Sequence, residues 1–141
     1  MSPLYIAEAV STGQGRDGEV RSSDGVIDER LSSPTELGGP GGAYTNPEQL
    51  FAAGYSACFH SALRAAAARS GTPLERSEVT ARVGIGKDEA DGGFQLSVSL
   101  EARLPELSQA QADEVVEAAH TVCPYSKATR GNIDITVSVV V

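Results

Sequence analysis

Apolar and polar residues alternate along the C-terminal part of the chain and predict strands there. From Phe94 to Leu104 every second residue is apolar, and the residues between them are Gln, Ser, Glu or Arg. This period of two is typical of a strand with one buried and one solvated face. The same alternation from Ile133 to Val141 predicts a closing strand, and a further strand is expected from Ser77 to Lys87.

The middle of the chain carries the signals of one long helix. Asn46 suits the N-cap, Pro47 the first helical position, and Gln49 the third position of a capping box. The helix should run to about Ser70, where Gly71 can end it. Its interior is rich in Ala, Gly and Ser, which let another backbone approach closely. We therefore expect a central helix, and a two-fold contact with its own copy is compatible with this composition.

The N-terminal segment predicts short strands joined by glycine-containing turns. We expect strands at Tyr5 to Ser11, Glu19 to Ser22 and Val26 to Leu31, the last two joined by an Asp-Gly turn. The Gly- and Pro-rich residues 32–45 exclude regular structure, and a loop of this kind often surrounds a site or an interface.

Two further helices complete the order. Ser108 and Gln111 form a capping box that opens a helix to about His120, and Pro124 begins a shorter one. The order βββ-α-ββ-α-α-β predicts an α+β fold, with an antiparallel sheet packed on a long central helix, rather than alternating βα units.

Length and composition limit the possible functions. A chain of 141 residues fits a single domain, residues 1–141. The formal net charge of −8 argues against nucleic acid and anionic membrane surfaces as partners. The weakly polar run from Leu50 to Leu63 is too short to cross a bilayer. Because the N-terminal MSPLYIAEAV lacks the pattern of a secretory signal, we expect a cytoplasmic protein.

The two cysteines are the candidate reactive groups, since a permanent disulfide is rare in a reducing cytoplasm. Cys58 lies within the long helix between Ala57 and Phe59, where burial alone would raise the pKa of the thiol and leave it an inert small hydrophobe. Cys123 precedes Pro124 at a predicted helix start, where free backbone N–H groups favour a thiolate. We therefore expect Cys123 to be the more accessible thiol.

The other chemical candidates are weaker. The four residues Cys58, Cys123, His60 and His120 could together hold zinc, but His60 follows Cys58 by two positions and so points to a different face of the helix. Neither a Ser-His-Asp pattern nor a phosphate-binding loop is present. We therefore expect neither a bound metal nor a bound cofactor.

Several segments together resemble the organic hydroperoxide resistance protein family, within the superfamily that includes osmotically inducible protein C. They are 16-RDG-18, 37-LGGPGGAYTNPEQLFAAGYSACF-59, 83-VGIG-86 and 118-AAHTVCPYSKATRGNID-134, and the resemblance covers nearly the whole chain. The two cysteine motifs are specific, whereas the RDG turn alone is weak. The chain departs from the family pattern at Tyr44, His60 and Lys127, and Tyr44 and Lys127 could alter access to the site.

The resemblance implies a thiol peroxidase that reduces organic hydroperoxides to alcohols. Cys58 takes the peroxidatic place, Cys123 the resolving place, Arg16 that of the activating arginine, and Glu48 that of the carboxylate that holds the arginine. It further implies an intertwined homodimer with sites at the interface, and reduction by a dihydrolipoyl group on a lipoylated protein.

Helix geometry adds two expectations. Glu48 and Cys58 are ten residues apart, or roughly 15 Å along one helix, too far for both to contact one arginine. We therefore predict that the Glu48 near any Cys58 comes from the partner chain. Tyr55 and Phe51 lie one and two turns before Cys58, and with Tyr125 they are predicted to line an apolar substrate wall, with ordinary core packing as the alternative.

Three alternatives remain open at this point. They are a small-molecule-binding dimer of the same fold in which the cysteines do not turn over, a peroxidase of the osmotically inducible branch that prefers hydrogen peroxide, and a structural disulfide protein.

Overall fold

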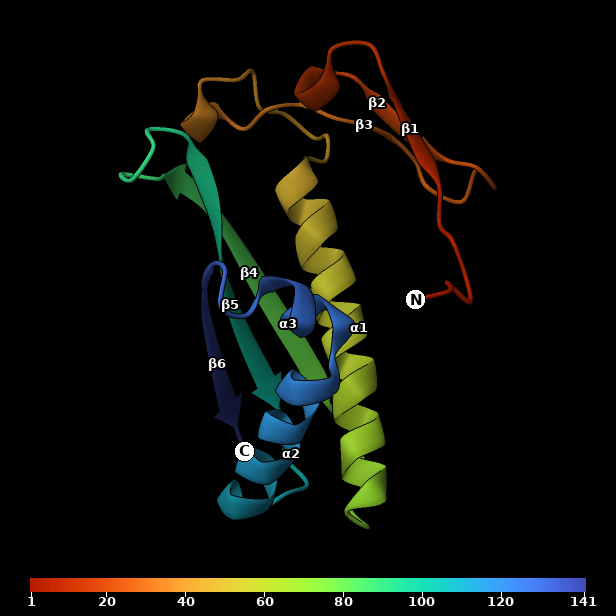
Figure 1. Cartoon of the computed structure of the whole chain (residues 1–141), viewed down its shortest axis with the longest axis vertical. Coiled ribbons are helices and arrows are strands. Elements are labelled where there is room, and N and C mark those ends of the chain that lie inside the picture. Colours follow the sequence, from red (N-terminus) through yellow and green to blue (C-terminus); the bar gives the residue numbers. More distant parts are fainter. The chain divides into compact units, whose positions relative to one another are not determined.

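The computed structural model describes residues 1–141 and has the predicted α+β element order (Figure 1). The chain divides into two compact units, Met1–Leu50 and Phe51–Val141, which are described separately. That the whole chain acts as one domain stays a prediction.

The first unit contains a three-stranded antiparallel sheet in the order β1-β2-β3. Its strands are β1 (Ala9–Thr12), β2 (Glu19–Ser22) and β3 (Asp28–Arg30). The first strand begins later than its predicted start at Tyr5. Ladder pairing with β2 starts at Ala9 and ends at Thr12, so the residues before Ala9 have no partner strand and their apolar side chains are exposed.

The long helix α1 (Pro47–Arg69) agrees closely with its prediction. The Asn46 side chain accepts a hydrogen bond from the backbone N–H of Gln49 at 2.8 Å, which confirms the N-cap. The capping box is only half formed, because the Gln49 side chain accepts from the Thr45 hydroxyl instead. Beyond the helix, Gly71 has a φ of +75°, the left-handed conformation that suits glycine after a helix end.

The second unit has a sheet in the order β4-β5-β6, formed by β4 (Glu78–Lys87), β5 (Phe94–Arg103) and β6 (Asp134–Val140). β4 and β5 pair antiparallel, as predicted, but β6 runs parallel to β5, so the expectation of a wholly antiparallel sheet is wrong for this pair. The physical reason is the helical segment between β5 and β6. It carries the chain back to the end of the sheet at which β5 began, so β6 runs in the same direction as β5.

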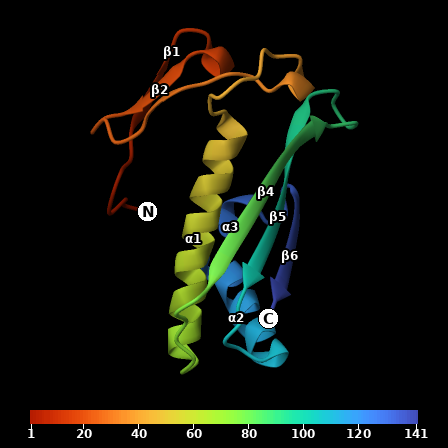
Figure 2. The same cartoon turned by 180° about the vertical axis from the view of Figure 1, so that it is seen from behind.

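All three helices cover one face of this sheet, as Figures 1 and 2 show from opposite sides. The other two are α2 (Gln109–Val122) and α3 (Pro124–Thr129). The predicted capping box of Ser108 and Gln111 is confirmed in both directions. Between helices and sheet lies the apolar core, to which β5 contributes one face and the helices the other: Tyr55, Phe59, Leu63, Val98, Leu100, Val115, Ala119 and Cys123. None of the helices combines the length and apolarity that crossing a membrane requires.

The capping box gives a test of how α2 is stabilised. Replacing Ser108 with Ala removes the acceptor for the Gln111 N–H, and we expect the free energy of unfolding to fall by about 1 kcal/mol. Ser108→Asp keeps an acceptor at the same place and should retain most of the stability. Urea denaturation at one fixed protein concentration measures both variants. A loss for Ser108→Ala no larger than that for Ser108→Asp would contradict this account.

Candidate active site

The structure brings the two cysteine sulfurs together. Cys58 lies on α1 and Cys123 between α2 and α3, 65 positions apart in sequence, yet their Sγ atoms are 3.7 Å apart, with the Cys123 thiol donating to the Cys58 sulfur. Both thiols are free. A disulfide is about 2.05 Å long, so small side-chain rotations and a slight approach of the two segments could close this pair.

The prediction that Cys123 is the more accessible thiol is wrong. Cys123 is 0% exposed, whereas Cys58 is partly exposed. Cys123 is the end of α2 as well as the start of α3, because its N–H donates to the carbonyl of Ala119 and its own carbonyl accepts from the N–H of Lys127. The sequence argument considered only the second helix, and a residue shared by two packed helices is directed into the core.

The environment of Cys58 has opposing effects on its ionisation. Burial raises the pKa of the Cys58 thiol above its ordinary value, as its sequence surroundings predicted. The backbone N–H of Tyr125, in the first turn of α3, acts in the other direction and lowers this pKa. An amide at the start of α3 therefore acts on the thiol of Cys58. A positive charge is still needed to make Cys58 a thiolate at neutral pH.

Arg16 and Glu48 form a two-pronged ion pair in the first unit. The Nη1 and Nη2 atoms of Arg16 donate to the two carboxylate oxygens of Glu48 at 2.9 and 2.7 Å. The Arg16 hydrogen bond holds the pKa of Glu48 below its usual range, and the same bond raises the pKa of Arg16. Glu48 is only 12% exposed, so the carboxylate fixes the guanidinium in one orientation.

The turn that carries Arg16 is itself fixed by the two residues that follow. The Asp17 carboxylate accepts a hydrogen bond from the backbone N–H of Ser33 at 2.9 Å. A Cβ atom at Gly18 would collide with the carbonyl oxygen of Thr12, so only glycine fits there. In the sequence, the RDG motif pointed only to its arginine. The structure shows that Asp17 and Gly18 fix the turn that carries this arginine.

Three aromatic rings pack together beside the cysteines. Phe51, Tyr55 and Tyr125 have ring centroids 5.6–6.1 Å apart. Tyr125 can lie against α1 because Gly54 has no side chain: a Cβ there would be 2.7 Å from the Tyr125 hydroxyl oxygen. Tyr55 is 0% exposed and lies under the other two rings.

Phe51 and Tyr125 line a cavity of about 680 Å³, whereas Tyr55 does not. Much of the remaining lining is apolar and comes from β5, α3 and the segment before β6: Phe94, Leu96, Pro124, Ala128 and Ile133. This volume is within the range of small-molecule sites. Two of the three residues predicted to form a substrate wall therefore face a cavity.

A chain of buried hydrogen bonds that the sequence did not reveal connects the three helices. The Ser126 hydroxyl lies 2.8 Å from both the Tyr55 hydroxyl and His120 Nδ1. The Tyr55 hydroxyl also lies 3.2 Å from the hydroxyl of Thr129, which donates to the carbonyl of Tyr125 at 2.8 Å. These polar residues lie in the two cysteine motifs, but the sequence does not show that their side chains meet, so only the structure shows that they form one network.

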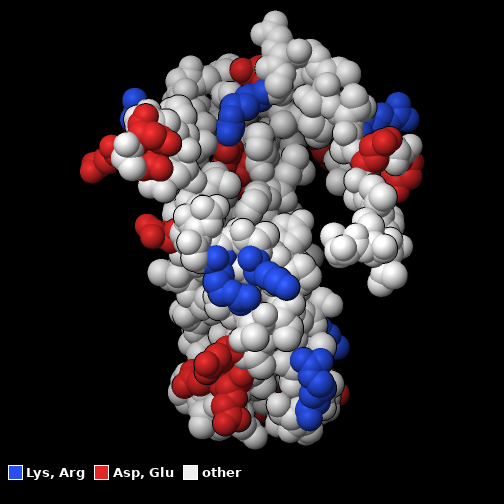
Figure 3. All heavy atoms as spheres, viewed as in Figure 1, with Lys and Arg blue, Asp and Glu red and all other residues white.

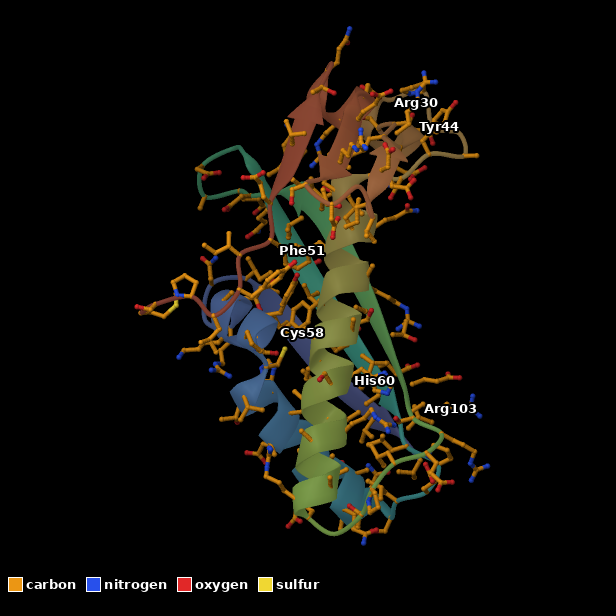
Figure 4. All side chains as sticks on the ribbon, turned by 90° about the vertical axis from the view of Figure 1, so that its right-hand side faces the viewer. Arg30, Tyr44, Phe51, Cys58, His60 and Arg103 are labelled. Carbon is orange, nitrogen blue, oxygen red and sulfur yellow. The ribbon has the colours of Figure 1, made fainter.

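The two histidines do not join the cysteines in a metal site. Figure 4 shows Cys58 and His60 on different sides of α1, and His60 Nε2 is bonded to the Ser77 hydroxyl at 2.8 Å. Burial lowers the pKa of His60. No group of three or more His, Cys, Asp or Glu side chains is arranged to bind a metal ion.

Charged groups are separated by sign on the helical face of the second unit. Figure 3 shows basic side chains over α3 and acidic ones over α2. The basic residues of this segment are Lys127 and Arg130, both exposed, and Arg130 donates to the carbonyl of His120 at 2.7 Å.

In the first unit, Tyr44, which departs from the family pattern, packs against Arg30. The guanidinium carbon of Arg30 lies 4.6 Å from the centre of the Tyr44 ring.

Comparison with known proteins shows what this arrangement resembles. Residues 39–138 match the family model described as OsmC-like protein. The organic hydroperoxide resistance protein of Xanthomonas axonopodis pv. citri is 50% identical over 135 residues, which cover 96% of this chain and 94% of that protein. Protein OhrA of Bacillus subtilis, also named as an organic hydroperoxide resistance protein, is 47% identical over 138 residues, covering 97% and 96%.

Solved structures give the same result. A Legionella pneumophila organic hydroperoxide resistance protein has a TM-score of 0.92 and 46% identity, and the match covers 99% of this chain and all of the other. The Bacillus subtilis protein OhrB has a TM-score of 0.89 and 43% identity, covering 98% and 100%. This chain therefore belongs to the OsmC-like family and, within it, to the organic hydroperoxide resistance proteins.

Proposed function

We propose that the protein is a cysteine-based peroxidase that reduces organic hydroperoxides to alcohols. The observation that carries the proposal is the 3.7 Å separation of two free sulfurs, one partly exposed and one buried. This arrangement suits a partly exposed thiol that meets the oxidant and a sheltered thiol that reacts only with its oxidised neighbour. The peroxide-detoxification role indicated by the names of the relatives agrees with it.

The first step is attack by the Cys58 thiolate on the outer oxygen of the hydroperoxide. The O–O bond breaks, an S–O bond forms, and the departing alkoxide takes a proton to become the alcohol. Cys58 is oxidised to a sulfenic acid and the hydroperoxide is reduced. Arg16, oriented by Glu48, is the proposed cation that favours the thiolate and stabilises the charge on the departing oxygen.

The second step joins the two sulfurs. The Cys123 sulfur attacks the sulfenic sulfur of Cys58, an S–S bond forms, and the hydroxyl leaves as water. A dithiol must then reduce the disulfide through a mixed disulfide; we propose a dihydrolipoyl group on a lipoylated protein as that reductant. The apolar cavity beside Tyr125 supports this choice, because both an alkyl hydroperoxide and a lipoyl chain would bury hydrocarbon there.

We further propose that the working form is an intertwined homodimer. α1 is continuous from Pro47 to Arg69, so Glu48 and Cys58 of one chain are separated by roughly 15 Å along its axis. The Arg16–Glu48 pair of one subunit would then act on the partner subunit's Cys58. We expect the reaction in the cytoplasm, where cellular reductants keep thiols reduced. No metal or bound cofactor takes part in this scheme.

Single-turnover oxidation tests the proposed chemistry. Reduced protein mixed with one equivalent of tert-butyl hydroperoxide should lose both thiols and form an intramolecular Cys58–Cys123 disulfide, visible by intact mass and thiol count. Cys58→Ser should remain reduced, and Cys123→Ser should stop at a sulfenic acid that dimedone traps. Hydrogen peroxide should react more slowly, because it gains nothing from the apolar cavity. Equal rates for the two oxidants would contradict the proposed preference for organic hydroperoxides. Oxidation of Cys58→Ser at the wild-type rate would disprove the assignment of Cys58 as the thiol that reacts with the hydroperoxide.

The pH dependence of the first step tests the role of Arg16. In a Cys123→Ser background, Arg16→Met should raise the pKa of Cys58 and lower its oxidation rate at neutral pH, because the thiolate fraction falls by about tenfold per unit of pKa once the pKa lies well above the pH. Because the pKa of Glu48 is lowered, its ion pair persists above the ordinary pKa of a glutamate and is lost only as the pH falls through the lowered value. At neutral pH the wild-type ion pair is therefore intact, and comparison with Arg16→Met measures the effect of that arginine on the pKa of Cys58. Ultraviolet absorbance of the thiolate measures the pKa, and Arg21→Met, an exposed arginine of β2, is the control. An unchanged pKa in Arg16→Met would exclude the proposed role.

Mixed dimers test whether the arginine acts across the subunits. Cys58→Ser, expected to be inactive, and Arg16→Met, expected to have reduced activity, are unfolded together and refolded as a mixture. If Arg16 acts on the partner subunit's Cys58, each mixed dimer has one intact site, and random pairing should restore about a quarter of the wild-type activity. Activity no greater than that of the separate variants would show that the arginine acts within its own chain.

A further inference from the structure

In the hydroxyl network of the second unit, only one assignment of donors and acceptors places a proton in every contact. Thr129 Oγ1 lies 2.8 Å from the carbonyl oxygen of Tyr125, which has no proton, so the Thr129 proton is used there. The 3.2 Å contact then requires the Tyr55 hydroxyl to donate to Thr129. Ser126 consequently donates to Tyr55, and the only proton left for the 2.8 Å contact between Ser126 and His120 is one on His120 Nδ1.

The reverse order leaves one contact without a proton. If the Tyr55 hydroxyl donated to Ser126 and Ser126 to an unprotonated His120 Nδ1, the oxygens of Tyr55 and Thr129 would face each other with no hydrogen between them. Tyr55 and Ser126 are both fully buried, so water cannot make up the missing bond. The reverse order therefore forms one buried hydrogen bond fewer than the first, which favours the first order.

The network is placed where it controls the position of Cys123. His120 lies in the last turn of α2 and Ser126 within α3, so Cys123 is between the two partners of one hydrogen bond. Ser126 in turn is bonded to Tyr55, one turn before Cys58 on α1. The same bonds that connect α3 to α1 therefore set the separation of the two sulfurs. Arg130, which donates to the His120 carbonyl, adds a second link between α2 and α3.

We propose that His120, as the tautomer protonated at Nδ1, is the positioning residue for the resolving step: it begins the chain of hydrogen bonds that holds Cys123 against Cys58. The proposal deepens the proposed function and rests on it for the reaction that is accelerated. His120 itself touches neither sulfur in this role and acts through Ser126 and Tyr55. Burial and the charge of Arg130 lower the pKa of His120, so the imidazole is neutral at neutral pH and its tautomer is a defined property.

Nitrogen NMR of the wild-type protein tests the tautomer without any reaction. The chain has two histidines, so two imidazole rings are observed, and His60→Leu identifies which belongs to His120. We expect a pyrrole-type Nδ1 and a pyridine-type Nε2 for His120 at neutral pH. The opposite assignment, with the proton on Nε2, would overturn the inference whether or not the protein is a peroxidase.

Paired substitutions test the effect on the reaction. His120→Asn retains an N–H donor near the Nδ1 position, whereas His120→Leu has a similar size and no donor. In single turnover with tert-butyl hydroperoxide, condensation of the Cys58 sulfenic acid with Cys123 should slow about tenfold in His120→Leu, equivalent to about 1.4 kcal/mol in the barrier. Condensation should remain near the wild-type rate in His120→Asn. The rate of Cys58 oxidation should change little in either variant. Tyr55→Phe, which breaks the chain at another point, should resemble His120→Leu.

The control is His60→Leu, which removes a histidine–serine hydrogen bond from α1 away from α3 and should leave condensation unchanged. Equal condensation rates in His120→Leu and the wild type would overturn the proposal, as would equal slowing in His120→Leu and His120→Asn. If the wild type itself forms no disulfide, the proposed function fails instead, and the nitrogen spectrum alone then decides the tautomer.

Discussion

The need to satisfy buried hydroxyl groups determines where α3 lies, and the candidate site depends on that position. Tyr55 and Ser126 are fully buried and can be hydrogen-bonded only by each other and by their immediate neighbours. Hydrophobic packing alone is tolerant of small shifts, whereas hydrogen bonds fix distance and direction. The proposed reaction requires two sulfurs that lie close together and remain unbonded when reduced. Packing alone does not set that distance, because Cys123 is a packed core residue.

The ionisation of Cys58 reflects a balance between burial and charge. Its place against the core shelters the sulfur but raises the pKa of the thiol, and the Tyr125 amide offsets only part of this effect. The cation proposed to act on this thiol, Arg16, is carried by a glycine-containing turn and is paired with Glu48. A paired arginine is oriented in advance, so less side-chain entropy is lost when it approaches a thiolate.

Local signals in the sequence were enough for most of the fold. The N-caps of α1 and α2 and the alternation in β5 depend on neighbouring residues only, and each appears where it was predicted. Predictions failed where distant segments decide the outcome: the parallel pairing of β6, the burial of Cys123 and the late start of β1. The cysteines and Arg16 were singled out through motifs, whereas the hydroxyl network depends on Tyr55, 74 positions from Thr129, and could not be predicted from either motif alone.

Tyr125 shows how one short helix can connect separate requirements of the site. Its backbone N–H lowers the pKa of Cys58, its ring lines the apolar cavity, and its carbonyl ends the hydroxyl chain. The ring reaches α1 only because Gly54 leaves room for it. A displacement of α3 would therefore weaken thiolate stabilisation, alter the cavity and separate the sulfurs at the same time. Since the hydroxyl chain opposes that displacement, the proposed substrate binding and disulfide formation would depend on the same few buried bonds.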